Sequence, residues 1–99
     1  MLLGKIVGTI VSTQKDHGLA GHKLLIVQNV DLDIKLKNSY LIASDAIGAG
    51  MGELVVVVQG SSARMAERTL NQPVDAAIIA IVDNMHVEGQ SKYSKGSNQ

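Results

Sequence analysis

The stretch DAIGAGMGELVVVVQGSSAR, residues 45–64, comes nearest to a ligand-binding motif because its glycines alternate with other residues. A loop that holds a phosphate needs the spacing G-x-G-x-x-G at a turn from a strand into a helix, whose N-terminus attracts the anion. Here Gly48, Gly50 and Gly52 have the spacing G-x-G-x-G, and ELVVVV, which follows, is typical of a strand. We therefore interpret the glycines as those of a tight β-turn, where they take positive φ or let another backbone approach closely.

Two carboxylates, Asp45 and Glu53, flank this glycine loop, and a carboxylate pair can act as acid and base. Carboxylates at a turn are more often solvated or paired with a cation, and Arg64 is the partner that we expect. Ser61 and Ser62 lack the G-x-S-x-G surroundings of a nucleophile, and helix capping explains a serine at this position. Because no nucleophile, base and oxyanion donors come together, the sequence predicts no enzyme.

Metal and cofactor chemistry has little support in the sequence. His17 and His22 lie in a glycine-containing loop beside Asp16, without helical i, i+4 spacing or an obvious third ligand. We interpret both, together with His86, as solvated histidines. The chain has no cysteine, which excludes thiolate sites and disulfides. We expect no metal and no cofactor.

The composition limits the classes of partner. The 99 residues fit one domain, and nine basic residues balance nine acidic ones, so the positive field that recruits nucleic acid or anionic membrane is missing. The N-terminus lacks the basic region of a signal peptide, and no apolar run approaches the roughly 20 residues of a membrane helix. We expect a soluble protein that binds neither nucleic acid nor membrane.

The expected elements are five short strands, because β-branched residues cluster in runs separated by Gly, Asn, Asp and Ser. They cover residues 5–13, 23–30, 40–44, 53–59 and 74–82. Residues 61–72, SSARMAERTLNQ, predict one helix of about two or three turns. This pattern indicates a mainly β fold, a small five-stranded OB-like β-barrel with one short α-helix between strands four and five.

The strands 53–59 and 74–82 are apolar on both faces, although a lone barrel needs only one apolar face per strand. The second face should be covered by another copy of the chain, and the glycine loop beside these strands then serves subunit contact. Residues 1–87 form the predicted barrel domain. Residues 88–99 are polar and contain glycine and serine, so we expect a flexible C-terminal tail.

Three segments together resemble one known family: GKIVGTIVSTQKDHGLAGHKLLIVQ, DAIGAGMGELVVVVQGSSAR and PVDAAIIAIVD. Their order and spacing resemble the EutN/CcmL family of bacterial microcompartment shell proteins, the vertex proteins, over residues 3–83. The resemblance implies a homopentamer that closes the corners of a polyhedral shell, carboxysome-like or metabolosome, in the bacterial cytoplasm. It also implies contact with the hexameric shell proteins that tile the faces.

The family's glycine-loop motif matches Gly48, Gly50, Gly52 and Glu53, and the motif that opens its helix matches Ser61, Ser62, Ala63 and Arg64. The resemblance implies that these residues lie at a subunit interface or the central pore, with Glu53 and Arg64 as a polar pair in ring assembly. The alternative function is a stand-alone OB-like module that binds a small ligand or single-stranded nucleic acid. Such a module normally carries aromatic and basic residues on its binding face, and this chain has two tyrosines and no other aromatic residue.

Overall fold

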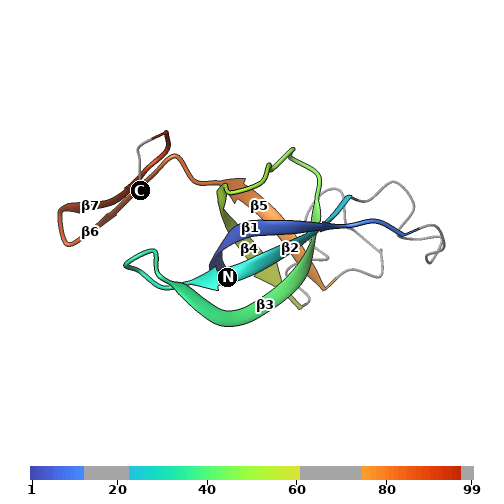
Figure 1. Cartoon of the computed structure of the whole chain (residues 1–99). Helices are drawn as coiled ribbons and strands as arrows, with labels where there is room; N and C mark the ends of the chain where they lie inside the picture. Colours follow the sequence, from blue (N-terminus) through green and yellow to red (C-terminus); the bar gives the residue numbers. More distant parts are fainter. Residues whose placement is uncertain (13–22, 61–74, 97–99) are drawn as a thin grey trace.

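A computed structural model describes residues 1–12, 23–60 and 75–96 (Figure 1). The described part contains seven strands and no helix, so the helix predicted for residues 61–72 lies outside it. The strands are β1 (Leu2–Ile10), β2 (Lys23–Val30), β3 (Leu36–Asp45), β4 (Leu54–Gln59), β5 (Ala76–Ile81), β6 (Asn84–Val87) and β7 (Gln90–Ser94). Within the described ranges, no helix has the length and hydropathy to cross a membrane.

Five strands close into a barrel in the order β1-β2-β3-β5-β4, with β4 pairing back onto β1 (Figure 1). All pairs are antiparallel except β3 and β5, which meet in parallel through only two residue pairs, Ser44 with Ala77 and Asp45 with Ile78. The five-stranded barrel is thus confirmed. The largest differences from the predicted bounds are at β1, which begins at Leu2, and at β3, which already begins at Leu36.

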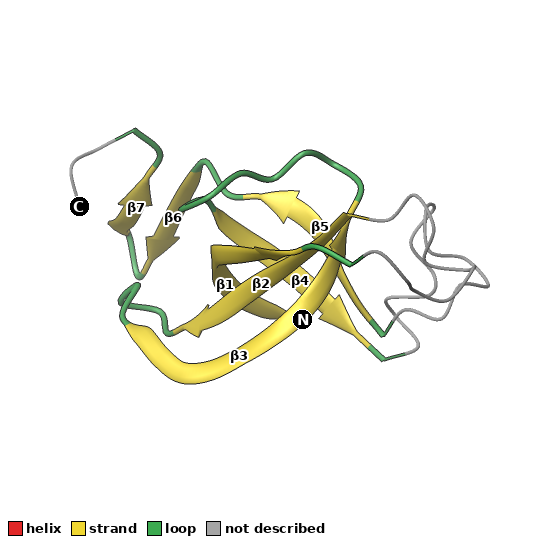
Figure 2. Ribbon diagram, turned by 45° about the vertical axis from the view of Figure 1, so that its right-hand side comes forward, coloured by secondary structure: helices red, strands yellow, loops and turns green. Residues whose placement is uncertain are grey.

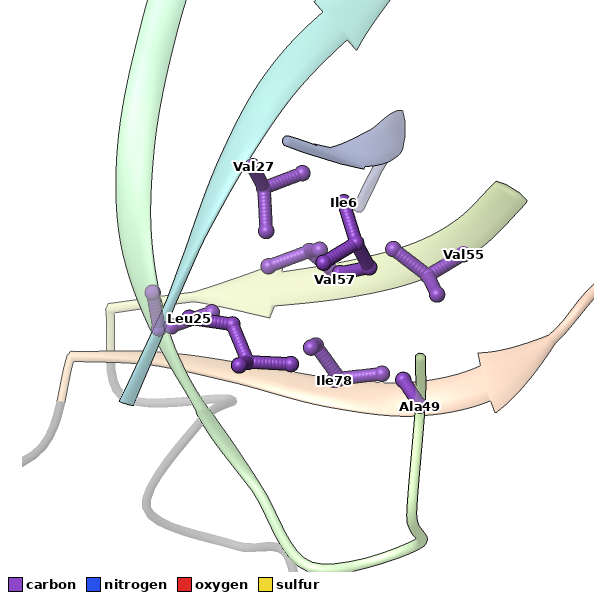
Figure 3. Packing of buried hydrophobic residues seen from close by; sticks show 9 residues of the cluster. Ile6, Leu25, Val27, Ala49, Val55, Val57 and Ile78 are labelled. Atoms are coloured by element: carbon purple, nitrogen blue, oxygen red, sulfur yellow. The ribbon is translucent and has the colours of Figure 1, made fainter. Parts of the chain in front are cut away.

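The barrel interior is filled by aliphatic side chains, as Figure 3 shows. Alternate residues of β2, Leu25 and Val27, belong to this cluster, as do Val55 and Val57 of β4. The largest fully buried side chains of the described part are Ile6, Leu25, Leu54, Val27, Val55 and Val57. Burying each such side chain contributes about 1.5 to 3 kcal/mol. Ala49 of the glycine loop belongs to the same cluster and lies beside Ile78, so the loop between β3 and β4 is anchored in the core.

The strands β6 and β7 form a separate two-stranded sheet, the C-terminal hairpin, which stands beyond the end of β5 (Figures 1 and 2). The tail predicted from residue 88 begins in its turn, and residues 90–94 are paired strand rather than an unpaired tail. The turn is Glu88 and Gly89, both at positive φ (51° and 78°), as a two-residue type I′ hairpin requires. Because the usual signal is Asn-Gly or Asp-Gly, the Glu-Gly turn escaped the sequence prediction.

Candidate functional site

The first half of the glycine loop, residues 46–53, is organised by one buried carboxylate at the end of β3. Oδ1 of Asp45 accepts hydrogen bonds from the N–H groups of Ile47 (3.0 Å) and Gly48 (3.2 Å), and Oδ2 accepts one from Ala49 (2.8 Å). The ammonium of Lys23 lies 4.0 Å from Oδ2 and donates to the carbonyl of Ala49. The Asp45 side chain has no exposed surface, so these partners replace the water that the carboxylate loses.

The second half of the loop is organised by Glu53. Its Oε1 accepts a hydrogen bond from the N–H of Gly50, and its own N–H donates to the Gly50 carbonyl. Two further backbone bonds join the loop to β1, from Gly52 N–H to the Ile6 carbonyl and from Ile6 N–H to the Glu53 carbonyl. The chain's own oxygens therefore occupy the N–H groups that a phosphate would need, which rules out the phosphate-loop interpretation on structural grounds.

The three glycines of the loop have different backbone requirements. Gly48 and Gly52 take φ of 86° and 81°, which favours glycine. Positive φ is thus confirmed at these two positions and is wrong for Gly50, where an added Cβ would meet Glu53 Oε1 at 3.3 Å. At Gly48 and Gly52 no described residue other than the chain neighbours lies within 4 Å of such a Cβ, so a close approach of another backbone there stays a prediction.

The outer surface of the loop is apolar. Ile47 is 46% exposed and Met51 is 64% exposed, whereas Ala49 between them is buried. The loop turns its polar backbone groups inward to Asp45 and Glu53 and presents two aliphatic side chains to the outside. Such a surface fits contact with another protein better than binding of a polar ligand.

Glu53 has an ion-pair partner that was not predicted from the sequence, while its predicted pairing with Arg64 stays a prediction. Arg64, Ser61 and Ser62 lie outside the described residues. Within the described part, Glu53 Oε2 lies 2.8 Å from the ammonium of Lys95, at the base of the C-terminal hairpin. The hydrogen bond from Lys95, followed by that from Gly50, lowers the pKa of Glu53, and Glu53 in turn raises the pKa of Lys95.

Sequence reasoning missed Lys95 because residues 88–99 were interpreted as a tail. A hairpin signal at residues 88–89 would have brought Lys95 back beside Asp83, and its backbone N–H does donate to the Asp83 carbonyl at 2.8 Å. The lysine ammonium also lies 3.9 Å from the Asp83 carboxylate. Glu53 therefore connects three parts of the molecule, namely β1, the glycine loop and the hairpin.

The remaining candidate residues do not form a reaction centre in the described residues. Asp45 is committed to three backbone donors and Glu53 to Lys95, so neither is a free acid or base. His86 lies exposed on β6, whereas His17 and His22 fall outside the described ranges. The described residues contain no group of three or more His, Asp or Glu side chains able to hold a metal ion.

Comparison with known proteins connects this arrangement to one family. The family profile described as "Ethanolamine utilisation protein EutN/carboxysome" matches residues 1–83. The carboxysome shell vertex protein CcmL of Nostoc sp. is 47% identical over 96 residues, covering 96% of this chain and 95% of the relative. The bacterial microcompartment shell vertex protein EutN of Escherichia coli K12 is 43% identical over 95 residues, covering 96% of this chain and all of the relative.

Solved structures agree with the sequence comparison. The structure of Gloeobacter violaceus CcmL superposes with a TM-score of 0.93 at 37% identity, covering 98% of this chain and 100% of that one. The GrpN pentameric microcompartment shell protein of Rhodospirillum rubrum superposes with a TM-score of 0.80 at 41% identity, covering 88% of this chain and 100% of that one. The similarity includes the barrel and the glycine loop between β3 and β4.

Proposed function

The chain belongs to the EutN/CcmL family of microcompartment shell vertex proteins, and we propose that it assembles as a homopentamer that caps the corners of a polyhedral bacterial shell. The observation that carries the proposal is similarity over nearly the full length to proteins that are themselves shell vertex proteins. Its role is structural rather than enzymatic. The alternative of a stand-alone binding module loses support, because the relatives compared above are all shell proteins.

The pentamer has a geometric reason. Flat layers of hexagonal tiles cannot close into a polyhedron without fivefold points, and a ring of five identical chains provides such a point. The contacts in a ring are head-to-tail, so each subunit offers two different surfaces. The hexameric shell proteins of the faces are then its neighbours, in the cytoplasm of a bacterium.

The glycine loop is the surface that we place at a subunit interface or the central pore. The exposed Ile47 and Met51 support this placement, since aliphatic side chains held on an anchored loop lose water favourably on contact. The residues proposed for this region are Gly48, Gly50, Gly52, Glu53, Ser61, Ser62 and Arg64. For Ser61, Ser62 and Arg64, the family motif is the sole basis of this assignment.

The test is the absolute mass of the purified protein, measured by light scattering after size exclusion at several concentrations. We expect five times the 10.5 kDa of one chain. A monomer at every concentration would contradict the proposal. The placement of the loop is tested with Met51→Lys, which should reduce the pentamer fraction, against Leu32→Lys in the β2–β3 turn, where the leucine is similarly exposed at 61%. Equal effects of the two variants would remove the loop from the interface.

A further inference from the structure

The C-terminal hairpin has one apolar face. Met85 on β6 pairs directly with Tyr93 on β7, and Val87, two residues further along β6, points to the same side. All three are partly buried. Asn84 and His86, which alternate with them, are exposed on the opposite side. The hairpin is therefore amphipathic, and its apolar face is incompletely covered within the chain.

Two ion pairs join the hairpin to the barrel. Lys92 lies 3.1 Å from Asp33 of the β2–β3 turn, and Lys95 lies 2.8 Å from Glu53 of the glycine loop. Within the described part, β6 and β7 pack chiefly on each other and not on the strands of the barrel. A two-stranded hairpin alone is marginally stable in water, and a further layer on its apolar face would stabilise it.

A second incompletely covered apolar surface lies on the outside of the barrel. Leu25 and Ala43 point into the core, so their neighbours Ile26 and Ile42, which pair across β2 and β3, point outward. Tyr40 and Ile42 are 57% and 53% exposed. They line an open groove of about 520 Å³, the outer groove, which is formed by Ile26, Tyr40, Leu41, Ile42, Gln59, Asp75 and Ala76.

The two surfaces lie at opposite ends of β5. The outer groove includes Ala76, where β5 begins. The hairpin follows the other end of β5, after Ile81, and Figures 1 and 2 show it beyond the tip of this strand. Six residues of strand separate them by about 20 Å, so the hairpin of a chain does not cover the groove of the same chain. A head-to-tail contact between two copies covers both surfaces at once and repeats around a ring.

We propose that the C-terminal hairpin of one protomer packs its apolar face, Met85, Val87 and Tyr93, into the outer groove of the next protomer. This inference rests on the proposed pentamer, and it names the elements that join its subunits. A second copy is the fitting occupant because each chain carries one hairpin and one groove. In a closed ring no hairpin and no groove is then left uncovered.

The absence of cysteine makes cross-linking a direct test. The double variant Ile42→Cys with Tyr93→Cys, treated with a short bis-maleimide, should give a ladder of covalent species up to five chains. Mixing the two single variants should give covalent dimers only. The matched control is Ile42→Cys with His86→Cys, which places the second cysteine on the polar face of the same hairpin and should give several-fold less product.

A second measurement does not depend on cysteine placement. Met85→Asp should raise the concentration at which the pentamer dissociates by about tenfold or more, whereas His86→Asp on the opposite face should leave it nearly unchanged. Equal cross-linking yields for the Tyr93→Cys and His86→Cys double variants would overturn the inference. So would equal dissociation concentrations for Met85→Asp and His86→Asp. Either result would leave the proposed function standing if the protein is still a pentamer. A parent chain that is monomeric by light scattering would overturn both.

Discussion

The glycine loop and the β2–β3 turn share a hydrogen-bonding pattern, but the organising aspartate is buried in the first and lies at the surface in the second. In each, one aspartate at the start accepts backbone N–H groups of the following residues: Asp45 accepts three, and Asp31 accepts those of Asp33 (2.8 Å) and Lys35 (3.0 Å). Each turn also carries a second carboxylate that binds a lysine of the C-terminal hairpin, Glu53 with Lys95 and Asp33 with Lys92. The Asp45 side chain is fully buried, whereas the β2–β3 turn lies at the surface.

The backbones of the two turns differ accordingly. The glycine loop places Gly48 and Gly52 where φ is positive, so it avoids steric strain. The β2–β3 turn holds Ile34 at φ 61°, which costs a residue with a side chain about 1 to 2 kcal/mol, and its N–H donates to the Asp31 carbonyl. An aspartate that accepts backbone N–H groups is thus part of the buried structure in the glycine loop, whereas in the β2–β3 turn it lies at the surface.

The largest expected effect is that of removing the buried carboxylate. Asp45→Ala leaves the N–H groups of Ile47, Gly48 and Ala49 without their acceptor inside the protein, which should lower the free energy of unfolding by about 3 kcal/mol. Urea unfolding followed by circular dichroism measures this change. Asp83→Ala, at a carboxylate that is 76% exposed, serves as the control. If the two variants lost the same free energy of unfolding, the burial of Asp45 would not explain its contribution to stability.

The next effect concerns the glycine backbone. Gly48→Val forces a β-branched residue to positive φ where no described residue other than the chain neighbours lies within 4 Å of the added Cβ, so the expected loss of about 1 to 2 kcal/mol is conformational in origin. Gly50→Ala, at a position with ordinary φ, should lose less, because only the Glu53 carboxylate must shift. Thermal unfolding of the two variants gives the comparison. If Gly50→Ala lowered the stability more than Gly48→Val, the positive φ of Gly48 would not be the main reason why the loop needs glycine.

The Glu53–Lys95 pair should make the stability of the hairpin depend on pH. The pKa of Glu53 is lowered from 4.5, so its stabilising pair with Lys95 is complete above that value and is lost as the pH falls through the lowered pKa. The pKa of Lys95 is raised from 10.5, so the pair is also lost as the pH rises past the raised value. The protection of β7 amides against hydrogen exchange, taken relative to the intrinsic exchange rate at each pH, should therefore fall at acid pH, and Glu53→Gln should remove this loss of protection. Asp33→Asn is the matched control and should retain it.

The smallest effect is expected at the exposed aspartate. The N–H of Lys35, ahead of that of Asp33, lowers the pKa of Asp31, so its contribution is present at neutral pH and fades as the pH falls through the lowered pKa. Because solvent replaces lost bonds at the surface, Asp31→Ala should shift the melting temperature less than any variant above. If Asp31→Ala lowered the melting temperature as much as Asp45→Ala, the two aspartates would contribute equally to stability and burial would not distinguish the two turns.

The barrel could be predicted from the sequence because β-branched runs with period-two alternation leave few ways to bury one face of each strand. The positive φ of Gly48 and Gly52 followed in the same way from residue type. The role of Asp45 did not, since its three N–H partners depend on how the loop folds back to bury Ala49. The Glu53–Lys95 pair joins residues far apart in the chain, so only the paired hairpin brings it together.

The two-residue parallel contact between β3 and β5 has a consequence for folding kinetics. Ser44 and Asp45 must find Ala77 and Ile78 across a long intervening segment, and such non-local pairing forms late because loop closure costs entropy before contacts compensate for it. The antiparallel β1–β2–β3 sheet can form first, and closure of the cylinder follows. Pulse-labelling hydrogen exchange should then protect β2 amides before those of β5, and the reverse order would show that closure nucleates folding.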